Sequence, residues 1–299
     1  LDLRMSTLPT IYGEKVVLRL LMRNNNLLDR RGIGMDEEDG KKLDKLLRRT
    51  SGVILIVGPT GSGKSSTMYT MIKELISEST NLITLEDPVE YHIDGATQVQ
   101  INEKTGMTFA SGLRAILRQD PDIIAVGEIR DVETAEIAMR AAMTGHLVLS
   151  TIHTEDAISA IDRLRDMGVE PYLIAGGIHG IISQRLVKKI CTNCREEYEP
   201  DSELQRVLGI EPDSGIRFTR GKGCHMCFST GYRGRTGVFE ILTLDESLRN
   251  AIVDGKSKQE LRKIVEQKGF VSMAQEAERL IRNGVTTVEE ACRVINIQE

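Results

Sequence analysis

The stretch GPTGSGKSS directly follows the apolar run VILIV and fits the pattern G-x-x-x-x-G-K-[ST] without a gap. Its glycines Gly61 and Gly63 allow backbone N–H groups to turn inward around phosphate oxygens, and the following helix adds its positive end. Lys64 is expected to neutralise the β- and γ-phosphates, and Ser65 to place a hydroxyl on Mg²⁺. The stretch therefore predicts a nucleotide-binding loop formed by Gly58, Pro59, Thr60, Gly61, Ser62, Gly63, Lys64, Ser65 and Ser66.

Acidic residues stand at the ends of two further apolar runs. DIIAVGE ends in Glu128, at the place where phosphate-loop enzymes usually carry the Asp of the Mg²⁺ shell, so Glu128 is expected to serve there. LEDPVEY brings Glu86, Asp87 and Glu90 to the same edge of the sheet, where ligands of such sheets bind. Surface solvation explains any one acid at a strand end, but four that converge on the phosphate side predict a catalytic group.

Two histidines flank the strand in HLVLSTIHT. For His146 the spacing favours a hydrogen-bonded core histidine. His153 is expected where the strand leaves the sheet on the phosphate side. There it would sense the γ-phosphate and pass its presence to the following helix.

Four cysteines form two pairs, Cys191-x-x-Cys194 and Cys224-x-x-Cys227, with 29 residues between the pairs. This is the spacing of a four-thiolate zinc site, in which each pair supplies two corners of a tetrahedron. All four positions are then filled, so the spacing predicts a structural Zn²⁺; two reduced pairs without metal are the alternative. The fifth cysteine, Cys292, is expected to be a buried free thiol on the last helix.

Apolar runs that alternate with helical patterns supply the elements that must position these residues. Strands are predicted at 53–58, 81–87, 97–101, 122–128 and 146–151, and helices at 64–79, 109–119, 131–145 and 154–168. Continuous apolar strands separated by helices predict an α/β fold with a mostly parallel sheet covered on both faces. The alternative reading of GPTGSGKSS, a chance match in a Gly-rich turn, is disfavoured in this context.

Both ends of the chain depart from this alternation. Residues 3–22 are predicted to form two strands that turn at Gly13, and a polar linker and a short basic helix over 41–49 follow. Two strands alone are marginally stable, so we expect them to be the last hairpin of a domain whose body has been cut away. Residues 188–240 are rich in Gly, Cys and Arg, and the rest is helical, with capping boxes at SKQE and TTVEE.

Composition restricts the class of protein. A formal net charge of -5 in 299 residues argues against a chain built mainly to coat nucleic acid, and 40% apolar but only 4% aromatic residues suit an aliphatic α/β core. No apolar run approaches the roughly 20 residues that span a bilayer, and no signal-peptide pattern opens the chain. Five cysteines in a chain of this kind indicate metal or thiol chemistry rather than disulfides.

Four stretches together identify a family resemblance. GPTGSGKSS, ITLEDPVEY, LRQDPDIIAVGEIRD and AAMTGHLVLSTIHT follow in the order of the Walker A, Asp box, Walker B and His box of the secretion ATPases. From about residue 5 to its end, the chain resembles the assembly ATPases of type II secretion systems (the GspE/EpsE family), close kin of the pilus assembly ATPase PilB. The resemblance implies a RecA-like domain in a hexameric ring, with ATP held against an N-terminal PAS-like domain.

The resemblance also assigns roles to residues. It implies that Glu128 is the general base or the water-positioning acid, and that Glu90 is its partner from the Asp box. Arginines that can reach nucleotide in the family match Arg114, Arg118, Arg130, Arg4 and Arg19. An arginine supplied to a phosphoryl-transfer site contributes about 10³–10⁵ in rate. For the two on the predicted helix, whose four-residue spacing places them on one side, a solvated face is the alternative.

The energy of hydrolysis, on this interpretation, drives mechanical work. The resemblance implies a cytoplasmic homo-hexamer that is peripheral at the inner membrane. A membrane recruiter protein would dock this hexamer, and the hexamer would turn a membrane platform protein. That motion would assemble a pseudopilus for protein export. The four cysteines favour assembly, because the retraction ATPases lack this insertion. The basic residues near them form a solvated face or a surface for anionic lipid: Arg185, Lys188, Lys189, Arg217, Arg220, Lys222, Arg233 and Arg235.

The domain division follows from these assignments. The parts are a hairpin of the truncated domain (1–22), a linker with a short helix (23–52), the RecA-like core (53–187), a tetracysteine zinc subdomain (188–240) and a helical subdomain (241–299).

Three rival functions stay open at this point. A nucleic-acid translocase on the same core needs a basic channel with aromatic stacking residues, which this chain does not evidently offer, so no nucleic-acid partner is expected. A small-molecule phosphotransferase needs a lid and an acceptor pocket. Pilus assembly is the nearest rival, since the secretion interpretation depends on overall similarity and not on one diagnostic residue.

Overall fold

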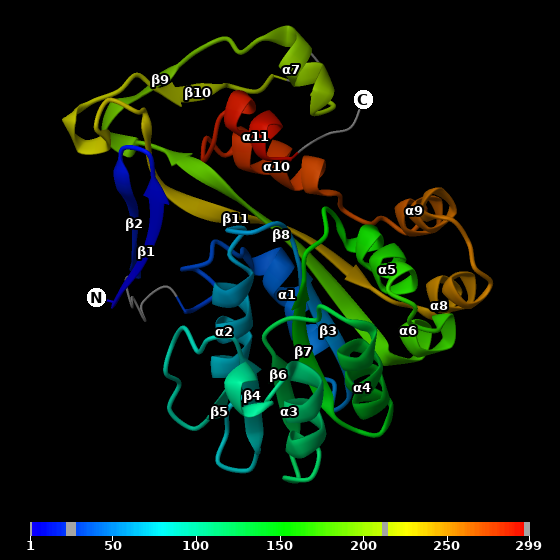
Figure 1. Ribbon diagram of the computed structural model, residues 1–299. Helices are drawn as coiled ribbons and strands as arrows, with labels where there is room; N and C mark the ends of the chain where they lie inside the picture. The colour runs from blue at the N-terminus through cyan, green and yellow to red at the C-terminus, as the bar shows by residue number, and fades with distance from the viewer. Residues whose placement is uncertain (1, 22–27, 211–214, 296–299) are drawn as a thin grey trace.

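Seven strands form the central sheet of this computed structural model, which describes residues 2–21, 28–210 and 215–295 (Figure 1). Their spatial order is β11-β8-β3-β7-β6-β4-β5. The strands are β3 (Gly52–Val57), β4 (Leu82–Glu86), β5 (Thr97–Gln100), β6 (Ile123–Val126), β7 (Leu147–Ile152), β8 (Ile178–Ile190) and β11 (Tyr232–Thr243). All neighbours in the sheet are parallel except β11, which is antiparallel to β8. The predicted α/β class with a mostly parallel sheet is confirmed.

Helices cover both faces of this sheet, and the side chains of β3 alternate between the two cores. Val53, Leu55 and Val57 pack with α3 (Phe109–Ile116), α4 (Val132–Met143), α5 (Ala157–Asp166), α6 (Pro171–Gly177), α8 (Glu246–Val253) and α9 (Lys258–Glu266). Ile54 and Ile56 pack on the opposite face with α1 (Glu37–Leu47) and α2 (Lys64–Leu75). Because β3 is buried on both faces, its sequence is continuously apolar.

Two long strands extend the sheet beyond the parallel core. β8 and β11 run as an antiparallel pair past the sheet and reach the cysteine region, where the short strands β9 (Arg195–Glu197) and β10 (Thr219–Gly221) pair (Figure 1). Helices α7 (Ser202–Val207), α10 (Met273–Arg282) and α11 (Val288–Val294) pack with Val187 and Val238 in a separate apolar core. The predicted boundaries at 187/188 and 240/241 therefore fall inside β8 and β11.

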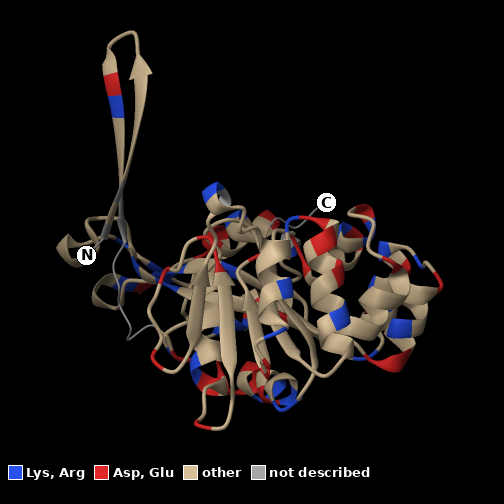
Figure 2. Ribbon diagram, turned by 60° about the horizontal axis from the view of Figure 1, so that its bottom comes forward, with Lys and Arg blue, Asp and Glu red and all other residues tan. Residues whose placement is uncertain are grey.

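The N-terminal hairpin lies apart from the sheet. Within the described residues, β1 (Asp2–Thr10) and β2 (Gly13–Leu21) pair only with each other, as predicted, and Figure 2 shows them projecting from the body. Arg4 and Arg19 are direct partners in the hairpin register. Apolar side chains on both strands face solvent, with Ile11 at the tip 90% exposed.

The start of α1, the end of α2 and one of the two capping boxes differ from the prediction. The predicted basic helix over 41–49 is α1, which begins four residues earlier because Asp36 accepts a hydrogen bond from the N–H of Asp39. Helix α2 ends at Leu75, short of the predicted 79. The capping box at Ser257 is confirmed, but at Thr287 only the forward bond forms, because Glu290 accepts the N–H of Lys188 instead.

Candidate functional site

The phosphate loop connects β3 to α2 and passes close to β8. Gly58 has φ +149°, and a Cβ at this position would collide with the carbonyl oxygen of Gln184. Gly63, with φ +92°, is the N-cap of α2, and its Cβ would lie 2.8 Å from Gln184 Nε2. Both positions require glycine, because a side chain would push the loop off β8. The loop therefore ends at a helix N-terminus that is free to meet an anion.

Lys64 is buried in this loop, with 7% of its surface exposed. Its Nζ donates hydrogen bonds to the carbonyl oxygens of Gly58 (2.8 Å) and Pro59 (3.0 Å). Burial lowers the pKa of Lys64 to about 8, and the charge of Glu128 opposes this shift. Ser62 Oγ is buried too and has no hydrogen-bond partner within the described residues. An ammonium group and an unpaired hydroxyl in one loop fit the phosphate oxygens of a nucleotide.

A chain of charged and polar groups leads from Lys64 across the ends of three strands. His153 Nδ1 lies 3.4 Å from Lys64 Nζ, and His153 Nε2 lies 3.6 Å from Glu128 Oε2. Glu128 Oε1 forms an ion pair with Arg130, whose guanidinium lies 3.9 Å from Asp87 Oδ2. The parallel sheet places these groups together because the carboxyl ends of β4, β6 and β7 share one edge.

His153 is neutral near neutral pH, because burial and the adjacent Lys64 ammonium lower its pKa. Since Nδ1 faces an ammonium group, which can only donate, Nδ1 accepts and the ring proton is on Nε2. That proton is directed at the carboxylate of Glu128. His153 thus lies between the phosphate loop and Glu128. A change in the charge of Lys64 therefore alters the electrostatic potential at both His153 and Glu128.

Glu86 lies away from this cluster, in a buried network below the loop 87–91. Its side chain is 3% exposed and accepts hydrogen bonds from the hydroxyls of Tyr69 and Thr84 and from Gln98 Nε2. Glu90 is exposed, and its backbone N–H donates to the Tyr69 hydroxyl at 3.0 Å. The structure therefore places Asp87 beside Arg130, the ion-pair partner of Glu128, leaves the Glu90 carboxylate at the surface, and buries Glu86 inside the fold.

The helix arginines lie outside the charged cluster. Arg114 Nη2 lies 2.5 Å from Glu133 Oε1 on α4, and both side chains are more than half exposed. Arg118 donates a hydrogen bond to the carbonyl oxygen of Arg114 at 2.9 Å. In this single chain, the guanidinium group of Arg114 supports the α3–α4 contact, and that of Arg118 bonds the backbone of its own segment.

The four predicted zinc ligands do come together. The sulfur atoms of Cys191, Cys194, Cys224 and Cys227 all lie within 4.8 Å of one another, with pairs at 3.7 Å and 3.9 Å. A tetrahedron with Zn–S bonds of about 2.3 Å has sulfur atoms about 3.8 Å apart, so the donor set fits Zn²⁺. The side chain of Asn193 donates to Cys224 Sγ at 3.4 Å and helps to lower the pKa of that thiol to about 6.

Sequence patterns missed three polar residues that hold the site. Thr151 Oγ1 donates to the carbonyl oxygen of Gly127 at 2.7 Å and so fixes the turn before Glu128. Thr67 Oγ1 donates to Gln184 Oε1 at 2.6 Å and ties α2 to β8. Tyr69 holds the loop 87–91, as described above. No periodicity marks these residues, because each bond joins elements that are distant in the sequence.

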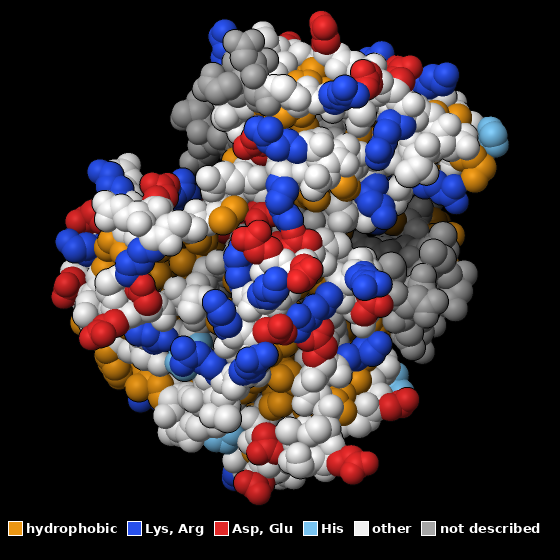
Figure 3. All heavy atoms as spheres, turned by 180° about the vertical axis from the view of Figure 1, so that it is seen from behind, with side chains coloured by type: hydrophobic (Ala, Val, Ile, Leu, Met, Phe, Trp, Pro, Cys, Tyr) orange, Lys and Arg blue, Asp and Glu red, His pale blue; other side chains and the backbone are white. Residues whose placement is uncertain are grey.

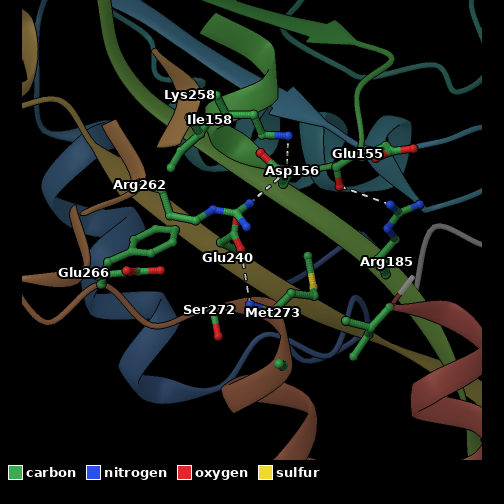
Figure 4. Close-up of a pocket in the computed structure, with 13 residues that line it drawn as sticks. Glu155, Asp156, Ile158, Arg185, Glu240, Lys258, Arg262, Glu266, Ser272 and Met273 are labelled. Atoms are coloured by element: carbon green, nitrogen blue, oxygen red, sulfur yellow. Dashed lines mark hydrogen bonds and ion pairs between the residues drawn. The ribbon is translucent and has the colours of Figure 1, made fainter. Parts of the chain in front are cut away.

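A separate polar pocket of about 310 Å³ lies where α5, α9 and α10 meet β8 and β11 (Figure 4). Glu240 is buried there and accepts the first N–H groups of α5 and α10, at 3.1 Å and 3.2 Å. Figure 4 shows Asp156 facing Lys258 and Arg262, each 3.2 Å from its Oδ2. These contacts join the core to the C-terminal helices.

Three of the eight basic residues near the cysteines form ion pairs with acids within the described part of the chain: Lys188, Arg217 and Arg220. Arg220 Nε lies 3.0 Å from Glu196 Oε1, and Lys188 Nζ lies 3.7 Å from Glu290 Oε2. Figure 3 shows lysine and arginine side chains intermixed with acidic ones across the face that it presents. This mixture of charges fits a solvated face, and a surface for anionic lipid stays the other prediction for these residues. Within the described ranges, no helix combines the length and apolar character needed to cross a bilayer.

Comparison with known proteins identifies the family to which this chain is similar. Residues 1–293 match the family model described as Type II/IV secretion system protein. The chain is 48% identical over 293 residues to the Type II secretion system protein E of Pseudomonas aeruginosa, covering 98% of this chain and 58% of that protein. It is 47% identical over 291 residues to the Type IV pilus assembly ATPase PilB of Thermus thermophilus, covering 97% of this chain and 33% of that one.

A solved structure shares the fold. The structure titled "Crystal Structure of the Pilus Retraction Motor PilT and Bound ADP" is 30% identical, with a TM-score of 0.71, covering 97% of this chain and 73% of that chain. The chain spans 58% of the length of the type II secretion relative. The resemblance of the four sequence boxes to the secretion ATPases is confirmed. The chain belongs to the Type II/IV secretion system protein family.

Proposed function

We propose that this chain is the ATP-hydrolysing part of a secretion or pilus assembly motor. The observation that carries the proposal is the contact series from Lys64 through His153 to Glu128, because it connects a phosphate loop to a carboxylate at a neighbouring strand end. The similarity to the Type II secretion system protein E and to the Type IV pilus assembly ATPase PilB supports it.

In this proposal each group has one task. The loop N–H groups and Lys64 hold the phosphates, and Ser65 would hold Mg²⁺, which neutralises phosphate charge when bound. Glu128 orients the attacking water and takes its proton, and the ion pair with Arg130 holds that carboxylate in place. His153, between Lys64 and Glu128, responds to the γ-phosphate. The predicted nucleotide contacts of Glu90, Arg114 and Arg118 belong to the same proposal.

The wider assembly is also part of the proposal. The active form is a homo-hexamer in which Arg4 and Arg19 reach a nucleotide, at the cytoplasmic face of the inner membrane. Zn²⁺ stabilises the cysteine region, and the partners are a platform protein and a recruiter. We favour pseudopilus assembly in type II secretion; identities of 48% and 47% leave pilus assembly as the alternative.

The substitution Glu128→Gln tests the hydrolytic role. The amide cannot take up a proton, so turnover should fall by about 10²–10⁴-fold, while ATP affinity is unchanged because the loop contacts persist. Phosphate release and nucleotide binding are measured side by side. The matched control is Glu136→Gln on α4, which removes only an ion pair to Arg140. Near-normal hydrolysis by Glu128→Gln would remove this residue from the mechanism.

A further inference from the structure

The hydroxyl of Tyr69 is buried beside the site and makes a full set of hydrogen bonds. Tyr69 is on α2, the helix that begins at the phosphate loop, and it is 1% exposed. Its hydroxyl donates to Glu86 Oε2 and accepts the backbone N–H groups of Glu90 (3.0 Å) and Tyr91 (3.2 Å). One donated and two accepted bonds use the whole capacity of a phenol.

The loop 87–91 has further contacts with β5, where Gln100 Oε1 accepts the N–H of Val89 at 3.3 Å. Gln98 on β5 donates to the carbonyl oxygen of Tyr91 at 2.8 Å, and the ring of Tyr91 packs edge-on against Tyr69, with centroids 5.1 Å apart. On its outer side the loop bears Asp87, which faces Arg130, and the exposed Glu90. The loop is thus held from inside by Tyr69 and reaches the charged cluster outside.

We propose that Tyr69 is a positioning residue for the reaction: its hydroxyl fixes the loop 87–91, and so sets where Glu90 and Asp87 stand relative to Glu128. Burial and the Glu86 carboxylate raise the pKa of Tyr69, so the hydroxyl stays protonated near neutral pH. Because Tyr69 is part of α2, the loop is fixed relative to the phosphate loop itself. This inference rests on the proposed hydrolytic role of Glu128 and Glu90.

Tyr69→Phe is the direct test, since it keeps the ring and removes one oxygen. Two loop N–H groups then lose their acceptor, and displacement of the loop should lower kcat for ATP by about 10- to 100-fold while the Kd for ADP stays within about twofold. The matched control is Tyr91→Phe, which removes a hydroxyl from the loop but leaves the two N–H bonds. It should keep kcat within about twofold.

A double-mutant cycle separates positioning from general damage. If Tyr69 acts through Glu90, Tyr69→Phe should lower kcat by less than about twofold in a Glu90→Gln background. The inference would be overturned if the fold-losses in kcat of Tyr69→Phe and Glu90→Gln multiplied in full in the double variant. A normal kcat for Tyr69→Phe alone would overturn it too. If Tyr69→Phe does not fold, adding Glu86→Gln replaces the buried carboxylate that has lost one of its three donors, and the cycle is repeated in that background.

Hydrogen exchange distinguishes failure of this inference from failure of the proposed function. Tyr69→Phe should speed exchange at the amides of Glu90 and Tyr91 at least about tenfold, with α2 unchanged. If exchange rises but both Glu128→Gln and Glu90→Gln hydrolyse ATP normally, the proposed function fails and the loop anchor stands. If Glu128→Gln is inactive and Glu90→Gln is normal, the inference on Tyr69 fails and the role of Glu128 stands.

Discussion

At the scale of single residues, Lys64 and Glu128 carry opposite charges and lie on either side of the neutral imidazole ring of His153. Lys64 is buried among carbonyl oxygens and loses hydration, so its charged form is disfavoured until an anion arrives. Glu128 is held by Arg130 on one oxygen and faces His153 with the other. Binding of a phosphate near Lys64 would stabilise its charged form, and His153 would transmit the change to Glu128.

The lowered pKa of Lys64 predicts a pH dependence of nucleotide binding. With a pKa of about 8, the free site keeps the ammonium charged below this pH and loses it above. Phosphate favours the charged form, so binding takes up a proton above pH 8, and ATP should bind about tenfold more weakly at pH 9 than at pH 7. Fluorescent nucleotide titrations at constant ionic strength measure this.

Lys64→Ala is the control for that measurement. This variant should bind more weakly at every pH, but its affinity should show no step between about pH 7 and pH 9, because the titrating group is gone. An equal pH slope in the wild-type chain and in Lys64→Ala would assign the effect to another group.

At the scale of elements, the strand pair β8 and β11 joins the nucleotide site to the cysteine cluster. Midway along β8, Gln184 contacts the phosphate loop, and beyond the C-terminal end of β8 lie the four sulfur atoms. The pair is anchored before it reaches the cysteines, because Ile190 N–H donates to the carbonyl oxygen of Val285 at 2.9 Å. Loss of the cluster should therefore not spread into the sheet.

Removal of two thiolates should unfold the cysteine region locally. About one Zn²⁺ per chain is expected, and structural thiolate sites contribute about 10–16 kcal/mol of apparent binding energy, much of it coupled to folding. Cys191→Ser with Cys194→Ser should expose residues 191–231 to protease and hydrogen exchange, while ADP still binds. The control Cys292→Ser should leave zinc content and protection unchanged. Carefully purified protein that lacks zinc would contradict this prediction.

At the scale of the whole molecule, the N-terminal hairpin stands apart from the charged cluster (Figure 2). The hairpin carries Arg4 and Arg19 as register partners, so the two are delivered to the same place wherever the hairpin docks. A two-stranded ribbon with exposed apolar side chains is marginally stable alone. We infer that neighbouring parts of the assembly set its position, and that the arginines complete a site only then.

Assembly should therefore control the rate. ATPase activity per chain should rise more than linearly with protein concentration, and Arg19→Ala should lower the activity of the assembled form far more than that of the monomer. An arginine delivered to phosphate contributes about 10³–10⁵ in rate, so the difference should be large. Activity is measured across concentrations alongside molar mass.

Subunit mixing gives the sharper measurement. If the arginines act across an interface, inactive Glu128→Gln chains should restore some activity when combined with Arg19→Ala chains, since each supplies what the other lacks. Specific activity that stays flat with concentration, together with a fully active monomer, would contradict a shared site.

The sequence by itself determined the features that depend on contiguous residues. The phosphate loop needs glycines at fixed positions, and the apolar runs of β3 and β7 reveal strands buried on both faces. The capping box of α9 spans four residues, Ser257 to Glu260, and was predictable for the same reason. Parallel strands share one carboxyl edge, so the meeting of Asp87, Glu128 and His153 also followed from the pattern.

Tertiary structure decided the partners that come from distant segments. Glu86 and Glu90 are four residues apart, yet one is buried against Tyr69 and Gln98 and the other faces solvent. Glu290 does not complete the predicted capping box. Its carboxylate instead accepts a hydrogen bond from the backbone N–H of Lys188, which is 102 residues away in the sequence. Each outcome depends on how remote strands and helices pack, because a polar side chain bonds whichever buried partner the fold brings to it, and local sequence does not encode that partner.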